Sequence, residues 1–422
     1  MAHEVIVVGG GIGGLTTAAL LSARGVNVCL IERGDNVGGC ASVFEKFGYE
    51  FELGFGVYSG WTEGEIYQKI FDELKTEQPK TILLNPAYTV CLPDGFEISI
   101  TNSINEVEDY IRTVFPECAD DAIAFYKKEE FSNFQNLSTR FRSFISAQQQ
   151  IFGNNFYTRK EMHTITGGIK SLSDILIASF KKNGGVVRLN SPALRLAFDS
   201  DGLAVGVDLL NGERVESTKA IVSNLSVWDT FGRLIGLNRT PSVIRQRLKN
   251  VQGQSSYLIF LSVDEKVINK FPSKLLLAVC DWEDTEKSLL TISVSPKIHN
   301  GKRAVTVFTF ANPEDWFQFQ ESQDAVEELD QTHLEKAWRH LNLIVPELGD
   351  NVEIIETFTP KDFYELTRRR LGMVFTKTTE GFTYKTNLPN VYIVSDTVTN
   401  DFGIAAVSEL ALKVVNEIAP KS

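Results

Sequence analysis

The stretch from residue 4 to residue 32 constrains the fold of this 422-residue chain more than any other feature. It reads EVIVV, then GGGIGG, then LTTAALLSARG, and then VNVCLIE. A short, continuously apolar, β-branched run predicts a strand buried on both faces of a parallel sheet. The glycines and the apolar pattern that ends at Gly25 predict a tight turn followed by a helix. The stretch therefore predicts a strand–helix–strand unit that binds a dinucleotide.

Each glycine of this loop has a predicted task. Gly9 makes the tight turn, Gly11 lets the backbone approach a diphosphate, and Gly14 lets helix and strand close, with Gly13 in the same loop. Glu32 ends the second strand, where its carboxylate can accept hydrogen bonds from both ribose hydroxyls. A carboxylate there would repel a 2′-phosphate, so the pattern disfavours NADP.

A second glycine pair, Gly38 and Gly39, follows Glu32 almost at once. Its backbone amides can lie along the remaining diphosphate and the ribityl chain of a longer cofactor, which favours FAD over NAD. The alternative is that the pair only forms a turn. The residues alone leave both interpretations open.

Several stretches resemble the phytoene desaturase family, which also includes carotene isomerases and retinol saturase. The N-terminal match is ERGDNVGGCA followed by GYEFELGFG. Three later stretches resemble the family in order, at residues 166–196, 212–231 (ending its strand in Val-Ser-Asn) and 388–418. The match covers both ends and the middle of the chain, and it implies a flavoprotein fold with FAD as cofactor.

The resemblance also implies roles for particular residues. It places Arg33 with the glycines and Glu32 at the diphosphate and ribose, and Ala193 beside the adenine through backbone groups. Asp396 would meet the ribityl hydroxyls, while Gly403 and Ile404 would present amides to the flavin pyrimidine at a helix N-terminus. The chain departs from the family at Cys40, where Arg or Ser is common, and in the closing segment, which reads Ser-Asp rather than Gly-Asp and retains one glycine where several are common. These departures put substrate choice in doubt more than cofactor binding.

The matching segments are separated along the chain, so the expected α/β fold has a discontinuous Rossmann-like FAD-binding domain. Its expected segments are 1–75, 160–228 and 384–422. The insertions 76–159 and 229–383 are expected to form a substrate domain with a helical cap. Alternating runs at 255–263, 288–295 and 303–310 predict antiparallel strands, and the pattern over 323–344 predicts a helix. The expected result is a mixed sheet covered by helices beside the flavin.

Candidate substrate-lining residues come from two aromatic groups. Phe55, Tyr58 and Trp61 follow the flavin-proximal ELG stretch, where they would line a tunnel or fill the core. The second group consists of apolar residues at helical spacing, which predict an amphipathic helix. The apolar face of this helix would contact lipid or, as the commoner case, pack on its own domain. Its members are Phe131, Phe134, Leu137, Phe141, Phe144 and Ile145. The run Arg368-Arg369-Arg370 is interpreted as a solvated charged turn rather than a site for an acidic substrate.

Composition limits the partners. A net charge of −12 argues against nucleic acid and against anionic lipid held by charge alone. The five cysteines show no zinc or disulfide pattern, so no metal is expected and a reducing, cytoplasmic location fits best. Neither a signal peptide nor a membrane span is evident, which leaves a peripheral membrane contact open.

The favoured function is an FAD-dependent oxidoreductase that moves hydride between flavin N5 and an apolar, isoprenoid or polyene substrate, by desaturation, isomerisation or saturation. No catalytic side chain is assigned, because flavin chemistry needs no acid/base constellation. Without a second GxGxxG, electrons must pass to or from a diffusible partner such as oxygen or a quinone. Two alternatives stay open: a flavin amine oxidase-type small-molecule oxidase, and a non-enzymatic binding protein on the same scaffold.

Overall fold

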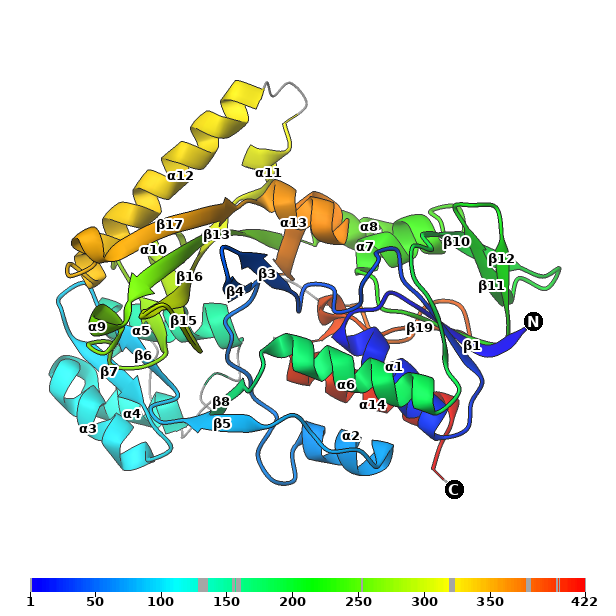
Figure 1. Ribbon diagram of the computed structural model, residues 1–422, viewed down its shortest axis with the longest axis horizontal. Coiled ribbons are helices and arrows are strands. Elements are labelled where there is room, and N and C mark those ends of the chain that lie inside the picture. The colour runs from blue at the N-terminus through cyan, green and yellow to red at the C-terminus, as the bar shows by residue number, and fades with distance from the viewer. Residues whose placement is uncertain are drawn as a thin grey trace.

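The computed structural model of the protein describes residues 2–127, 136–153, 156, 161–251, 253–318, 323–376, 381–399, 401 and 403–421. It contains two main sheets, each covered by helices, which form two lobes (Figure 1). We call them the nucleotide sheet and the inserted sheet. The nucleotide sheet receives strands from both ends and the middle of the chain, whereas the inserted sheet receives strands from the segments between them.

The nucleotide sheet has the strand order β10-β11-β12-β1-β2-β9, with β19 paired to β12. Its strands β9, β2, β1, β12 and β19 are parallel, and β10 and β11 add an antiparallel extension. The strands are β1 (His3–Val8), β2 (Val28–Ile31), β9 (Val186–Arg188), β10 (Ala193–Phe198), β11 (Ala204–Leu209), β12 (Arg214–Ser223) and β19 (Val391–Ile393).

Both faces of the nucleotide sheet are covered. Val5 and Val7 of β1 pack with one group of helices, while Ile6 and Val8 pack on the opposite face, so alternate side chains of one apolar run enter two cores. The first group is α1 (Ile12–Ala23), α2 (Ile66–Leu74), α6 (Ile169–Lys182) and α14 (Ile404–Ile418). The opposite face is covered by α7 (Val227–Asp229), η4 (Thr230–Leu234) and α8 (Ser242–Asn250). In Figure 1 the N-terminal helix α1 and the C-terminal helix α14 lie side by side.

The inserted sheet has the order β17-β13-β16-β15-β14-β6-β7, with β18 paired to β13. It is mixed, because β6 and β14 are parallel and the other pairs are antiparallel. Its strands are β6 (Tyr88–Cys91), β7 (Glu97–Ile100), β13 (Gly253–Asp264), β14 (Leu275–Ala278), β15 (Leu290–His299), β16 (Lys302–Ala311), β17 (Val352–Phe358) and β18 (Met373–Thr376).

Helices again cover both faces of the inserted sheet. Leu258 and Phe260 of β13 pack toward α3 (Ile104–Val114), α4 (Ala119–Lys127) and α5 (Thr139–Phe152). Tyr257 and Ile259 pack toward α12 (Gln323–Ile344), which spans the predicted 323–344. The remaining short elements are η1 (Pro116–Cys118), α9 (Glu265–Ile268), α10 (Thr285–Ser288), α11 (Pro313–Trp316), η5 (Gly349–Asn351), α13 (Pro360–Thr367), η6 (Arg370–Gly372) and η7 (Asp396–Val398).

Two small two-stranded sheets lie apart from the main sheets. One is the hairpin of β3 (Val43–Lys46) and β4 (Tyr49–Glu52), and the other pairs β5 (Thr81–Leu84) with the sequence-distant β8 (Met162–Ile165). The expected fold, a Rossmann-like part with an inserted mixed sheet and helical cover, is confirmed. The domain limits given from the sequence stay a prediction.

The ends of α1, α2 and α14 are joined by one ion-pair network. Arg24 follows α1 and pairs through Nε with Glu73 Oε1 at 2.6 Å, and Lys421 Nζ lies 2.8 Å from Glu73 Oε2. Arg24 also donates through Nη2 to Asn416 at 2.8 Å. The side chains of Arg24 and Glu73 are 10% and 9% exposed, so this pair is far less hydrated than an ordinary surface pair.

Replacing Glu73 by glutamine is expected to lower the free energy of unfolding at pH 7 by about 2 kcal/mol, between the values typical of exposed and buried pairs. Burial raises the pKa of Glu73, but hydrogen bonds from Arg24 and Lys421 outweigh it and hold the pKa below its usual value. The stabilisation is therefore present above the unfolded-state pKa and is lost as the pH falls through the lower folded-state pKa. Urea unfolding between pH 3 and 8 measures this. Asp174→Asn, at an exposed pair with Lys170, serves as the control and should change little.

Candidate functional site

Four strand ends of the nucleotide sheet meet at one edge. Gly9 follows β1, Glu32 follows β2, Asn224 follows β12 and Ser395-Asp396 lie just beyond β19. All four strands are parallel, so these residues lie at the carboxyl end of the sheet, where open α/β sheets bind ligands. They line one cavity together.

The first glycine loop is close-packed. Gly9 has φ of +100°, which favours glycine, and a Cβ on Gly14 would lie 2.0 Å from the Gly9 carbonyl oxygen. A Cβ on Gly13 would lie 2.4 Å from Cγ1 of Val407 in α14. Glycine is therefore required at both positions. At Gly14 the turn before α1 leaves no room for a side chain, and at Gly13 the neighbouring helix α14 leaves none. The role in helix–strand closure predicted for Gly14 fits this geometry.

The second glycine pair lies directly against the first loop. The Gly38 amide donates to the Gly10 carbonyl at 2.8 Å, and a Cβ on Gly39 would lie 3.2 Å from the Gly11 Cα. Gly38 and Gly39 have φ of +126° and +62°. The chain returns to the nucleotide loop after Glu32 and forms a double-layered glycine cradle, in which the absence of side chains lets the two loops pack backbone against backbone.

Glu32 closes one side of this cradle. Its Oε2 accepts from the Gly10 amide at 2.6 Å and its Oε1 accepts from the Gly34 amide at 2.7 Å. The carboxylate is thus held by two backbone donors at the point where the sequence predicts contact with ribose. Ala193, together with Ser191 and Pro192, also lines the cavity, and the Ser191 amide donates to the Glu32 carbonyl at 2.9 Å.

Asp396 lies in an ion pair that the sequence did not predict. Its Oδ2 is 2.8 Å from Nη2 of Arg369, and its Oδ1 accepts from the Ser395 hydroxyl at 3.0 Å. Burial lowers the pKa of Arg369, but the Asp396 carboxylate outweighs this and holds that pKa above its usual value. Burial raises the pKa of the neighbouring Cys40 thiol, so it remains protonated at neutral pH.

The N-terminus of α14 faces the same cavity. Gly403 is the N-cap residue with φ of +91°, no side chain in the described part of the protein caps the helix, and Gly403 and Ile404 both line the cavity. Free amides at this position suit an electron-rich group. Arg33 lines the cavity too, but its Nη2 donates to the Leu366 carbonyl. The cofactor roles of these residues stay predictions.

Asn224 is a site residue whose role the sequence did not predict, although the resemblance included the Val-Ser-Asn stretch. Its backbone N–H donates to the Val8 carbonyl at 2.8 Å, and its side-chain Nδ2 donates to the Val394 carbonyl. Its Oδ1 would lie 2.8 Å from a Cβ on Gly11. Asn224 therefore joins β1, β12 and β19 immediately beneath the glycine loop.

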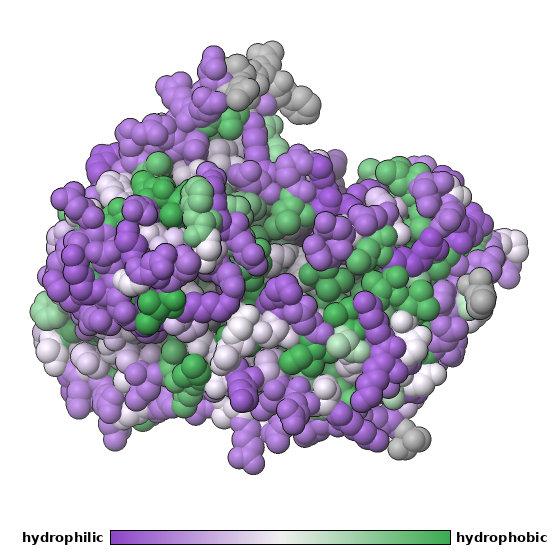
Figure 2. All heavy atoms as spheres, viewed as in Figure 1, coloured by the Kyte–Doolittle hydropathy of each residue, from purple (hydrophilic) through white to green (hydrophobic). Residues whose placement is uncertain are grey.

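The other end of the cavity is apolar. Phe55 and Tyr58 line it, and Phe55 packs edge-on against Phe308 with ring centroids 5.1 Å apart. The other apolar lining residues are Leu53, Val57, Ile151, Phe152, Met162, Phe363 and Val374. In Figure 2, apolar residues (green) gather around a hollow between the two lobes. A polar cradle thus continues into an apolar chamber.

The other predicted lining residues pack elsewhere. Trp61 stacks on Tyr67 with ring centroids 4.0 Å apart, and Phe141 and Phe144 are fully buried beside Phe115. They belong to the cores rather than to the cavity lining. Phe131 and Phe134 lie outside the described residues. In α5 it is the C-terminal end, at Ile151 and Phe152, that reaches the cavity.

A buried carboxyl group lies behind the chamber. Glu52 Oε2 accepts from the Tyr58 hydroxyl, and its Oε1 accepts from the Ile169 amide at 2.8 Å. Burial raises the pKa of Glu52 above its usual value despite these hydrogen bonds, and burial beside Glu52 raises the pKa of Tyr58. The pair fixes the start of α6 and holds the Tyr58 ring at the cavity wall.

The three arginines at positions 368–370 lie in different surroundings. Arg368 and Arg369 line the cavity, whereas Arg370 is exposed and lies 6.0 Å from the ring of Trp228. Interpreting the whole run as a solvated turn was therefore wrong for Arg369, which is 15% exposed.

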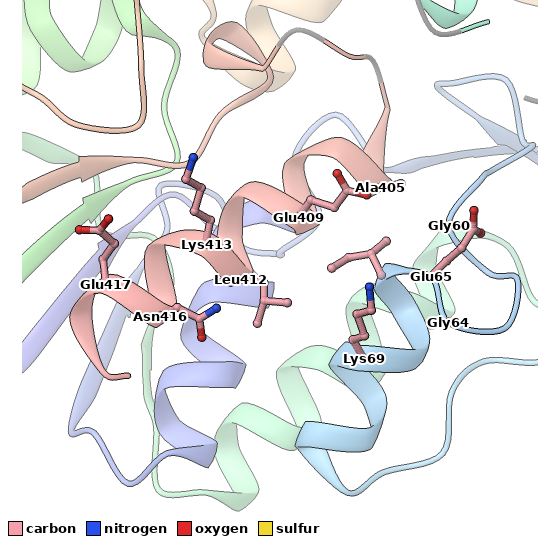
Figure 3. A pocket seen from close by; sticks show the side chains of 11 residues that line it. Gly60, Gly64, Glu65, Lys69, Ala405, Glu409, Leu412, Lys413, Asn416 and Glu417 are labelled. Carbon is pink, nitrogen blue, oxygen red and sulfur yellow. The ribbon is translucent and has the colours of Figure 1, made fainter. Parts of the chain in front are cut away.

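A second, open pocket lies between α2 and α14 (Figure 3). It is lined by charges of both signs, with Lys69 and Lys413 opposed by Glu65, Glu409 and Glu417. Its lining includes none of the described residues of the two glycine loops. The cradle and the apolar chamber belong to the first cavity.

A parallel sheet whose strand ends hold a double glycine cradle, a glutamate bound by two backbone amides and a helix N-terminus is typical of FAD-dependent oxidoreductases. The comparisons with known proteins agree. The family described as flavin containing amine oxidoreductase matches residues 112–368, and the NAD(P)-binding Rossmann-like domain matches residues 7–74. The chain belongs to the flavin containing amine oxidoreductase family, and FAD is its cofactor.

Similar curated proteins include all-trans-retinol 13,14-reductase of Danio rerio, 23% identical over 85% of this chain and 74% of the relative. Prolycopene isomerase 2 of an Oncidium hybrid cultivar is 24% identical over 99% of this chain and 84% of the relative. Phytoene desaturase (neurosporene-forming) of Rhodobacter capsulatus is 22% identical over 55% of this chain and 54% of the relative. The predicted resemblance is thereby confirmed.

Solved structures show the same fold. An oxidoreductase from Methanosarcina mazei aligns with a TM-score of 0.75 at 16% identity, covering 98% of this chain and 99% of that one. Putrescine oxidase bound to putrescine aligns with a TM-score of 0.65 at 14% identity over the full length of both chains. Among the described residues, no helix combines the length and the apolar character needed to cross a membrane.

Proposed function

We propose that this oxidoreductase moves hydride between flavin N5 and an apolar isoprenoid or polyene substrate, by desaturation, isomerisation or saturation. The observation that carries the proposal is the continuity of the glycine cradle with the apolar chamber around Phe55 and Phe308. Relatives named for retinol, prolycopene and phytoene support the substrate class.

FAD supplies the hydride acceptor or donor when bound. The glycine cradle fits its diphosphate, because glycine at positions 11, 13 and 14 lets the loop pack closely on Asn224, Val407 and Gly9, and the N-terminus of α1 has no side-chain cap among the described residues. Glu32 would hold the ribose, and Asp396 would orient the ribityl chain. Phe55 and Phe308 would exclude water and hold a conjugated chain by apolar contact, which orients a C–H bond without ionic groups.

The visible spectrum of the purified protein, before and after incubation with FAD, is the first test. Oxidised-flavin bands that survive gel filtration are expected. The holoprotein is then mixed under anaerobic conditions with all-trans-retinol, phytoene or prolycopene in detergent, and with putrescine. Flavin reduction or product formation with a polyene supports the proposal.

Reduction by putrescine with no response to any polyene would favour the amine oxidase alternative. A colourless protein that cannot be reconstituted would favour a binding protein. A prereduced sample is included in each case, because isomerisation and saturation need reduced flavin.

The electron partner is proposed to be diffusible, either oxygen or a quinone, since the sequence contains no second GxGxxG. Reoxidation of the reduced holoprotein by air or by a soluble quinone distinguishes the two. Peripheral contact with a lipid surface, which would deliver such substrates, stays a prediction, and sedimentation with phosphatidylcholine vesicles checks it.

A further inference from the structure

Arg369 reaches the cofactor cavity from a segment remote from the glycine loops. It follows α13 on the turn before β18, which is a strand of the inserted sheet. The turn is held by Arg368, with φ of +54°, and by a hydrogen bond of 3.2 Å from the Arg369 amide to the Thr367 hydroxyl. The guanidinium nevertheless lies beside Cys40 and Asp396 of the nucleotide part.

The guanidinium is fixed on two sides. Its Nη2 donates to Asp396 Oδ2 at 2.8 Å, and its Nη1 lies 3.8 Å from Cys40 Sγ, immediately after Gly38 and Gly39. Its Nε is buried and has no partner within the described part of the chain. One carboxylate therefore does not use all five donors of this side chain.

The unused donors of Arg369 could bind the negative charge of the cofactor. An FAD diphosphate brings two negative charges into a protein of net charge −12, and the glycine amides carry only partial charges. Arg33, Arg233 and Arg368 also line the cavity, but Arg369 combines low exposure with a buried Nε that has no partner among the described residues. Arg33 donates to Leu366, Arg233 is 48% exposed near Asp229, and Arg368 is 39% exposed and paired with Glu365. Arg369, at 15% exposure, is far less hydrated than Arg233 and Arg368.

We propose that Arg369 is a positioning residue for FAD: it supplies the cation for the phosphate-bearing part of the cofactor and orients Asp396 for the ribityl chain. The inference rests on the FAD cofactor of the proposed function. It also means that FAD binding joins the inserted part to the nucleotide part, because Arg369 belongs to one and its neighbours to the other.

The test measures FAD affinity of the refolded or stripped apoprotein by flavin fluorescence, together with the apoprotein melting temperature. Arg369→Met is expected to weaken FAD binding about ten- to a hundredfold, the effect of one charge-assisted hydrogen-bonding group. The FAD affinity of Arg369→Lys should lie between those of Arg369→Met and the wild type, because lysine keeps the charge but not the paired N–H donors of the guanidinium. The matched control, Arg370→Met, removes an exposed charge from the same turn and should stay within twofold.

Salt dependence separates a cofactor role from a structural one. FAD affinity of the wild type should fall as salt rises, and this dependence should be weaker in Arg369→Met but unchanged in Arg370→Met. Asp396→Asn removes the ion pair and keeps the Arg369 charge, so its salt dependence should resemble that of the wild type. If Arg369→Met fails to fold, Arg369→Gln, which also removes the charge but keeps a polar side chain, replaces it in both measurements.

Equal FAD affinity and equal salt dependence in Arg369→Met and Arg370→Met would overturn the inference and leave the proposed function intact. Equal losses in Arg369→Met and Asp396→Asn, with wild-type salt dependence in both, would make the ion pair merely structural. A wild-type protein that binds no FAD would overturn the inference together with the proposed function.

Discussion

Replacing Gly14 by alanine is expected to abolish FAD binding and to destabilise the fold by about 3 kcal/mol, the upper range for overpacking. The new Cβ would lie 2.0 Å from the Gly9 carbonyl oxygen, a backbone atom that cannot move without opening the turn between β1 and α1. The flavin absorbance of the purified variant and its thermal unfolding curve measure the two effects.

Gly232→Ala is the matched control, because Gly232 is also helical and a Cβ there would lie more than 4 Å from every described residue beyond its own helix and chain neighbours. It should retain flavin and unfold at the same or a slightly higher temperature, since alanine is the better helix former. Retention of FAD by Gly14→Ala would mean that the loop tolerates opening and that the cradle is wrongly assigned.

The second large effect is expected at Glu32. Glu32→Gln keeps the shape but replaces one acceptor oxygen with an NH₂ group, so either the Gly10 or the Gly34 amide faces a donor. A hydrogen-bonding loss of this kind should weaken FAD binding about ten- to a hundredfold. Titration of the apoprotein with FAD measures the change.

Asp35→Asn provides the comparison, because Asp35 is exposed three residues before Gly38 and outside the cavity lining. It removes the same charge from the same loop. Equal affinities in the two variants would show that only the overall charge of the loop matters, contrary to a specific contact of Glu32.

The parts of the fold that could be predicted have local causes. The β1–α1–β2 unit follows from an apolar run, glycines and a helical pattern that are close together in the sequence, and α12 follows from its own periodicity. The cavity could be predicted only in part. Helical spacing shows that one face of α5 is apolar, but not that Phe141 and Phe144 face Phe115 while Phe152 reaches the chamber.

Arg369 shows the other limit. Its neighbours Cys40 and Asp396 lie far from it in the sequence, and three consecutive arginines look alike until the turn after α13 directs one of them inward. Contacts of this kind depend on how two lobes meet, which no local pattern encodes.

The way in which the cavity is assembled has a consequence for biosynthesis. A ribosome makes β1 and the first glycine loop well before β19, which begins at Val391, and α14, which begins at Ile404. The nascent chain therefore carries a cradle without its closing wall while the residues between these elements are made. Flavin loading should therefore follow the synthesis of α14, and any chain stopped before residue 391 should emerge from the ribosome colourless.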